Sequence, residues 1–150
     1  TAFQHYDEKL PDMHDPLDRH YYNPFSAVYK VPMSDQIFVA QSSFIRRLAE
    51  QGPCVIVGRC ADRVLTDSVN LFIYAKMKDR VKRMVSLEPE ADPQEMEKRI
   101  REVDRKRKDY YQYYTGAQWG RAQNYHLCVE SGLVGVDGCL RAALAYLGEN

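Results

Sequence analysis

An arginine that follows a glycine at the end of an apolar run is the first candidate for chemistry. The run Cys54–Val57 leads into Gly58 and Arg59, and Asp62 comes three residues later. In open α/β sheets, ligands bind just beyond the carboxyl ends of the strands. An arginine there can hold a phosphate or a carboxylate, and a glycine lets the backbone approach the ligand closely. The alternative is a loop that starts a helix, in which Arg59 only pairs with Asp62 or another acid.

A dense basic stretch at residues 98–108 is the second candidate. It carries seven cations and only two acids, in a chain with 21 basic and 21 acidic residues. On a helix, Arg101, Asp104, Arg105 and Lys108 would share one face, because they are three or four residues apart. Charge runs are usually solvated helix faces. A local excess of this size in a neutral chain favours an anionic ligand such as a polyphosphate, with nucleic acid as an alternative.

Four tyrosines follow the basic stretch within residues 110–114, and Trp119 comes shortly after them. Aromatic rings beside arginines can stack on bases, as they do in proteins that bind single-stranded nucleic acid. We favour the more ordinary interpretation, in which the rings anchor the end of a helix against the core and each hydroxyl finds a partner at its rim.

The histidines give weaker signals. His14, Asp15, Asp18 and His20 resemble a metal cluster in composition, but their spacing fits neither a zinc site nor a facial triad. His126 lies inside a predicted strand and is predicted to be structural. The chain contains no G-x-S-x-G motif that would mark a nucleophilic serine. We therefore predict no metal site and no covalent catalysis from these residues.

The elements that must position these residues alternate between helices and strands. Apolar spacing and capping residues predict helices over residues 34–52, 78–85, 92–114 and 137–147. Short apolar runs, suited to strands that are buried on both faces, occupy residues 54–58, 69–75 and 125–130. The alternation predicts an α/β fold, with a parallel sheet flanked by helices.

The chain is predicted to hold one domain preceded by an arm. Residues 1–32 contain scattered prolines and no sustained period, which predicts an irregular arm. Residues 33–150 are predicted to form a single α/β domain with a lid-like helical segment around residues 92–120. The total of 150 residues is an ordinary size for one domain.

Composition excludes several classes of protein. A formal charge of zero argues against binding to nucleic acid by bulk charge, and the longest apolar runs are too short to span a membrane. No amino-terminal signal pattern is present. The four cysteines form no C-x-x-C pair and are predicted to be reduced core thiols: Cys54, Cys60, Cys128 and Cys139. Together these features predict a cytoplasmic protein.

Three segments in the same order and spacing resemble the cytidylate kinase-like family, whose members are P-loop proteins related to CMP kinase. The segments are Gln51–Asp62, Asp104–Gly116 and Trp119–Cys128. The resemblance extends over about residues 33–147. It implies a nucleoside monophosphate kinase fold, in which a P-loop follows the first strand and a lid carries arginines.

The resemblance also implies roles for individual residues. They are Gly58, Arg59 and Asp62 for substrate binding, Arg101, Arg105 and Arg107 for catalysis, and Asp104 and Tyr110 for support of the lid. The implied cofactors are ATP and Mg²⁺, and the implied partner is a small nucleotide substrate. Neither a membrane nor nucleic acid is an expected partner.

The chain departs from the family pattern at defined positions. Val57 and Cys60 stand where CMP kinases carry acids, which leaves the acceptor open, and Ile100 stands where a lid arginine is expected. No G-x-x-x-x-G-K-[ST] motif occurs, so the chain lacks a visible cradle for ATP phosphates. We expect the first strand and the P-loop to precede Thr1; the alternative is a protein that has lost catalysis.

The sequence thus predicts ATP-dependent phosphoryl transfer to a nucleoside monophosphate or a similar small substrate, by a kinase whose chain as given would not act alone. Two alternatives stay open. One is a non-catalytic nucleotide-binding or regulatory module on the same fold. The other is a nucleic-acid binder that uses the basic helix at residues 98–108.

Overall fold

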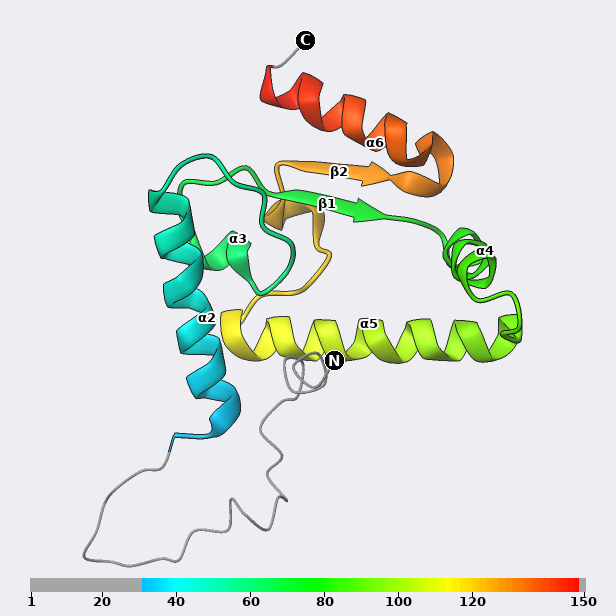
Figure 1. Cartoon of the computed structure of the whole chain (residues 1–150), viewed down its shortest axis with the longest axis horizontal. Coiled ribbons are helices and arrows are strands. Elements are labelled where there is room, and N and C mark those ends of the chain that lie inside the picture. Colours follow the sequence, from blue (N-terminus) through cyan, green and yellow to red (C-terminus); the bar gives the residue numbers. More distant parts are fainter. Residues whose placement is uncertain (1–30, 149–150) are drawn as a thin grey trace, which may run out of the picture. The chain divides into compact units, whose positions relative to one another are not determined.

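The computed structural model describes residues 31–148, which form a mostly helical structure with a small parallel sheet. In chain order the elements are α2 (Met33–Glu50), α3 (Ala61–Val64), β1 (Leu71–Tyr74), α4 (Met77–Leu87), α5 (Pro93–Thr115), the 3-10 helix η1 (Ala122–Asn124), β2 (Leu127–Glu130) and α6 (Ser131–Leu147) (Figure 1). The predicted irregular arm, apart from its last two residues, and the weak metal candidates of residues 14–20 lie outside the described residues.

The described residues divide into two compact units. The first contains residues 31–66 and 109–117, and the second contains residues 67–108 and 118–148. Helix α5 therefore contributes its residues up to Lys108 to the second unit and its last turns to the first. Each unit has its own packing.

Strands β1 and β2 form the sheet of the second unit, in parallel and in register from Leu71 opposite Leu127 to Tyr74 opposite Glu130. Two predicted strands, at residues 69–75 and 125–130, are thereby confirmed. The pairing begins at His126, whose Nδ1 accepts a hydrogen bond from the backbone N–H of Asn70 at 2.9 Å. The backbone N–H of His126 donates in return to the Asn70 carbonyl at 2.8 Å. This histidine is structural, as predicted.

The strand predicted at residues 54–58 is wrong for the described part of the chain. These residues pair with no strand in the described part of the chain, and Val55 and Val57 are 95% and 89% exposed. An apolar run favours burial, whereas a strand also needs a neighbour for its backbone hydrogen bonds. Among the described residues, β1 and β2 pair only with each other.

The cysteine prediction is correct in part. All four thiols are free; Cys60 is buried and Cys139 is partly buried, but Cys54 and Cys128 are exposed. Burial raises the pKa of the Cys60 thiol to about 12, so this thiol stays protonated and unreactive at neutral pH.

The tyrosines at the end of α5 hold that helix end in the first unit. The ring of Tyr114 stacks on Phe38 of α2 with centroids 4.1 Å apart, and its hydroxyl donates to Asp35 Oδ1 at 3.0 Å. Tyr110 and Tyr111 are buried, and so is Ile45 of α2. The favoured interpretation, in which these aromatic rings anchor a helix end, is confirmed.

Apolar side chains build the second unit around the sheet and along α5. Phe72 of β1 stacks on Tyr125 at 4.7 Å and meets the edge of Trp119 at 5.5 Å. On α5, Met96 and Ile100 are buried, which confirms the apolar line predicted for this helix. Met96 and Ile100 therefore lie on the face of α5 that is packed within this unit.

Helix α6 is longer than predicted and is interrupted near its start. Its first residue, Ser131, is buried and donates from Oγ to the Tyr74 carbonyl at 3.0 Å. Gly135 then takes φ 67° and ψ −176°, which is not helical, so the helix resumes at Val136. From there α6 runs beside the sheet to Leu147 (Figure 1). No helix in the described part of the chain has the length and apolarity needed to cross a bilayer.

The break in α6 gives a stability prediction. Gly135→Ala should lower the free energy of unfolding by about 1–3 kcal/mol, because its φ/ψ combination is available almost only to glycine. The cost is backbone strain alone, since an added Cβ there would meet nothing within 4 Å. Urea unfolding followed by the fluorescence of Trp119 measures it. Gly148→Asn is the matched control, because asparagine tolerates the left-handed conformation of that helix cap. Equal stability of the two variants would contradict the prediction.

Candidate functional site

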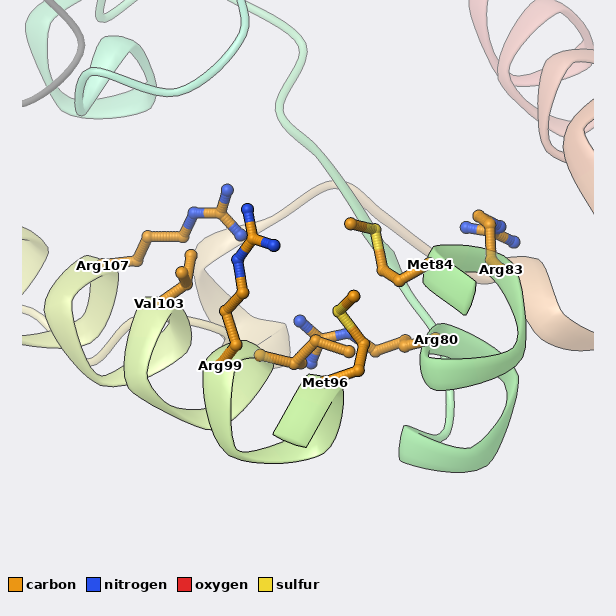
Figure 2. A pocket seen from close by; sticks show the side chains of 8 residues that line it. Arg80, Arg83, Met84, Met96, Arg99, Val103 and Arg107 are labelled. Atoms are coloured by element: carbon orange, nitrogen blue, oxygen red, sulfur yellow. The ribbon is translucent and has the colours of Figure 1, made fainter. Parts of the chain in front are cut away.

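Four arginines line a hollow of about 260 Å³ between α4 and α5, within the second unit. Its lining residues are Arg80, Arg83 and Met84 of α4, and Met96, Arg99, Ile100, Val103 and Arg107 of α5. Figure 2 shows Arg99 and Arg107 projecting from α5 into the same space as the two methionines. Guanidinium groups over an apolar floor favour an anion, and no carboxylate is among the lining residues.

An ion pair between Arg80 and Asp104 ties the two helices of this pocket together. Arg80 donates two hydrogen bonds to the Asp104 carboxylate, from Nη1 to Oδ2 and from Nη2 to Oδ1 at 2.8 Å. The two side chains are only 29% and 23% exposed. These hydrogen bonds raise the pKa of Arg80 above its usual value, against the opposing effect of burial. Arg80 is therefore charged, and its guanidinium is held in place.

Arg99 and Arg107 of α5 also pair with carboxylates. Arg99 donates from Nη1 to both carboxylate oxygens of Glu88, at 3.0 and 3.2 Å, and both side chains are largely exposed. Arg107 Nη1 lies 3.8 Å from Asp104 Oδ1. The Arg99–Glu88 pair is exposed, and exposed ion pairs are worth at most about 1 kcal/mol, so an incoming phosphate can replace it at little cost.

The structure brings together only part of the catalytic set implied by the resemblance. Arg107 lines the pocket, and Asp104 organises it. Arg101 and Arg105 are not among the lining residues. Arg101 instead donates to Glu97 Oε1, at 3.0 Å from Nε and 2.5 Å from Nη2, on an exposed face of α5.

Sequence reasoning missed two pocket arginines, Arg80 and Arg83, and included Arg99 only as part of the basic stretch at residues 98–108. Arg80 and Arg83 lie three residues apart on α4, and Arg99 lies on α5, so only the packing of the two helices brings the three together. A signal existed in the spacing of Arg80 and Arg83, which places both on one face of a predicted helix. The charge density at residues 98–108 is the stronger signal in the sequence, but it does not include α4.

The predicted substrate-binding residues lie in the first unit, in a strained turn. Gly58, Arg59 and Cys60 have φ values of 74°, 57° and 54°, all left-handed. Left-handed non-glycine residues cost about 1–2 kcal/mol each, and such strain is concentrated at functional sites. The buried side chain of Cys60 anchors the turn, and the Cys60 carbonyl accepts the backbone N–H groups of Arg63 and Val64.

Asp62, the third predicted substrate-binding residue, lies in α3 and belongs to a small polar network. The hydroxyl of Tyr111 donates to Asp62 Oδ2 at 2.5 Å and accepts from Arg63 Nε at 3.0 Å. Burial, together with the hydrogen bond to Asp62, raises the pKa of Tyr111 to about 12. Tyr110, the predicted lid support, directly precedes Tyr111 and is also buried. Its hydroxyl donates to Gln41 Oε1 at 3.5 Å.

Comparison with known proteins supports the resemblance seen in the sequence. The family model that matches the chain is described as "Cytidylate kinase-like family", and the match covers residues 1–133. The chain belongs to the cytidylate kinase-like family. Among proteins of curated function, none matches the chain significantly.

A solved structure agrees with the fold of this family member. The crystal structure of an uncharacterized protein from Eubacterium ventriosum is 29% identical to the chain, with a TM-score of 0.72. The similarity covers 79% of this chain and 76% of that one. Family membership therefore rests on the family model, and the solved structure supports the fold.

The Tyr111 network gives a prediction for stability at high pH. The folded protein keeps the Tyr111 proton up to a pKa of about 12, whereas the unfolded chain loses it near 10. The contribution of this group to stability is therefore full below about pH 10 and falls as the pH rises from about 10 to about 12. Tyr111→Phe should cost about 1–2 kcal/mol at pH 8 and weaken this pH dependence.

Urea unfolding followed by circular dichroism at pH 8 and pH 11 measures both effects. Tyr113→Phe is the matched control, because the Tyr113 side chain is about half exposed. This control should follow the wild type at both pH values. If Tyr111→Phe also had the stability of the wild type at both pH values, the network would contribute nothing to the stability of the fold.

Proposed function

We propose that the protein is a kinase that transfers a phosphoryl group from ATP to a nucleoside monophosphate or a similar small substrate. The observation that carries this proposal is the pocket of Arg80, Arg83, Arg99 and Arg107 between α4 and α5. Membership in the cytidylate kinase-like family supports the reaction class.

The chemistry of the pocket suits phosphoryl transfer. In that reaction the bond between the γ-phosphorus and its bridging oxygen breaks, and a new bond forms to a phosphate oxygen of the acceptor. The protein contributes mainly positioning and neutralisation of negative charge. The arginines surround the buried side chains of Met96 and Ile100, and donors placed in advance around a transferring phosphoryl group stabilise its negative charge.

The size of the pocket points to a phosphate chain rather than a whole nucleotide. At about 260 Å³ it is smaller than most pockets for drug-sized ligands, which begin at about 300 Å³. Asp104, the carboxylate beside it, is occupied by Arg80. Mg²⁺, which neutralises phosphate oxygens in this chemistry, would therefore arrive with the nucleotide.

The acceptor is expected to bind through Arg59, by resemblance to the family. The strained backbone at Arg59 and Cys60 supports a functional role for this turn. Val57 and Cys60 replace the acids expected of CMP kinases, so the acceptor assay should include several nucleoside monophosphates and other small phosphorylated compounds.

The nucleic-acid alternative loses three of the four tyrosines that could stack on bases. Tyr110 and Tyr111 are buried, and Tyr114 is stacked on Phe38 and bonded to Asp35, so these rings are occupied within the fold. Several cations of the basic stretch also pair with carboxylates on or near α5. These pairs are Lys98–Glu95, Arg99–Glu88, Arg101–Glu97 and Lys106–Glu102. A non-catalytic nucleotide-binding module would have the same pocket and would differ from a kinase only in showing no turnover.

Substitutions in the pocket test the anion site directly. Arg99→Ala and Arg107→Ala should each weaken binding of ATP and of tripolyphosphate about tenfold or more, because each removes a charge-assisted hydrogen-bond donor. Lys106→Ala, on the same helix but outside the pocket and paired with Glu102, should bind like the wild type. Isothermal titration calorimetry gives the affinities.

Turnover is measured separately with the complete protein, as formation of nucleoside diphosphate from ATP and each monophosphate. Arg59→Ala should reduce kcat/KM at least about tenfold if Arg59 holds the acceptor. Polyphosphate binding without turnover for any acceptor would favour the non-catalytic module. Equal binding by the wild type and both pocket variants would contradict the anion site itself.

Ligand binding should also change the dynamics of α5. A phosphate chain held by arginines of both α4 and α5 would tie the two helices together, so saturating ATP should slow amide hydrogen exchange in residues 98–120. Added salt should reduce the protection by screening these charges. Hydrogen exchange with mass spectrometry reports it, and β1 serves as an internal reference. Identical exchange with and without ATP would mean that this stretch is a fixed helix with no lid role.

A further inference from the structure

The turn that carries Arg59 has a backbone conformation that its residues do not favour. The backbone N–H of Ala61 donates to the Gly58 carbonyl at 3.1 Å, so Arg59 and Cys60 are the two central residues of the turn. Both have left-handed φ values, 57° and 54°. Turns of this kind usually carry asparagine or glycine in the centre. Because Arg59 and Cys60 are neither, contacts outside the turn must hold the strained backbone.

Helix α3, which follows the turn, cannot hold this conformation by itself. It has only four residues, Ala61–Val64, and its N-cap residue Cys60 makes no side-chain capping bond. Isolated helices shorter than about 12 residues are marginal even in favourable sequences. The buried side chain of Cys60 anchors the turn by apolar contact. A further, directional contact must therefore orient α3.

Tyr111 of α5 supplies directional contacts to α3. Its hydroxyl donates to Asp62 Oδ2 at 2.5 Å and accepts from Arg63 Nε at 3.0 Å, so one oxygen binds two consecutive residues of the short helix. Tyr111 is only 4% exposed, so packing fixes its position. The backbone N–H of Arg63 donates in turn to the Cys60 carbonyl at 2.8 Å. A contact that holds α3 therefore also holds the strained turn.

Tyr114, one turn further along α5, shows what a tyrosine that only anchors the helix does. Its ring stacks on Phe38 and its hydroxyl donates to Asp35, and both partners belong to α2. Tyr111 and Tyr114 thus each form a hydroxyl–carboxylate bond from the same end of α5. Of the two, Tyr111 is the one that bonds to the helix behind the Arg59 turn.

We propose that Tyr111 is a positioning residue for the acceptor, whose hydroxyl holds α3 and thereby keeps the strained turn in the conformation that presents Arg59. The inference rests on the proposed role of Arg59 in holding the acceptor phosphate. A bidentate contact between a guanidinium and a phosphate needs a defined geometry, so a turn that relaxes binds the phosphate more weakly although Arg59 itself is unchanged. Tyr111 acts through Arg59 and does not touch the acceptor.

Isothermal titration calorimetry of the complete protein with CMP, UMP, AMP and GMP tests this role. Tyr111→Phe should weaken binding of the monophosphate that the wild type binds most tightly by about fivefold or more. Its affinity for tripolyphosphate, the probe of the arginine pocket in the second unit, should stay within about twofold of the wild type. Tyr114→Phe is the matched control. It also removes a hydroxyl bonded to a carboxylate, and it should bind the monophosphate like the wild type.

Two further variants separate positioning from an independent effect. Because Tyr111 acts through Arg59, the double variant Arg59→Ala with Tyr111→Phe should bind within about twofold of Arg59→Ala alone, whereas independent effects would multiply. Arg63→Leu removes the other bond to the Tyr111 hydroxyl and should weaken monophosphate binding about threefold. The Arg63 side chain is 41% exposed, so this variant should fold even if Tyr111→Phe does not. Circular dichroism confirms that each variant is folded.

The outcomes distinguish this inference from the proposed function. Monophosphate binding by Tyr111→Phe or Arg63→Leu equal to that of the wild type would overturn the positioning role and leave the proposed function intact. So would effects that multiply in the double variant, or an equal loss of binding in Tyr114→Phe. If the wild type bound no monophosphate, or if Arg59→Ala bound it as tightly as the wild type, the proposed acceptor site would fail, and the role of Tyr111 with it.

Discussion

The arrangement of the second unit depends on the ion pair between Arg80 and Asp104. Four guanidinium groups around one hollow repel one another, and helices α4 and α5 would separate unless some of that charge were neutralised. Asp104 performs this role from a position that is only 23% exposed, where a bidentate pair is screened little by water. It also lies 3.8 Å from Arg107. One carboxylate therefore joins the two helices and sets the position of the charges that face a ligand.

This arrangement separates two kinds of arginine. Arg80 is largely removed from solvent and held by two hydrogen bonds, so it contributes a fixed positive charge to the pocket wall. Arg99 is paired with Glu88 at an exposed position, where exchange of one carboxylate for a phosphate oxygen changes the free energy little. The family resemblance implies that Asp104 supports the lid, and this role stays a prediction; the structure shows that Asp104 pairs with Arg80. The fixed charge of Arg80 is held in place without a ligand, and the exchangeable pair of Arg99 leaves that arginine able to bind one.

Local sequence patterns predicted the helices and strands better than they predicted the arginine pocket. Helix α5 was predicted over residues 92–114 and is observed over Pro93–Thr115, because Asp92 accepts the backbone N–H of Glu95 at 2.9 Å and the apolar line sets the buried face. The arginine pocket could not be predicted in this way. Arg80 and Arg99 are far apart in the chain and meet only after α4 and α5 pack. Charge density alone also failed to distinguish faces of α5, since Arg101 points to Glu97 and not to the pocket.

Apolar patterns report a need for burial but not always the partner that provides it. The run Cys54–Val57 was predicted to be a strand because it is apolar on both faces, yet Val55 and Val57 are almost fully exposed. Four consecutive apolar residues carry no information about direction, register or sign of charge in a neighbour. An apolar run therefore predicts that a segment is covered without identifying the segment that covers it.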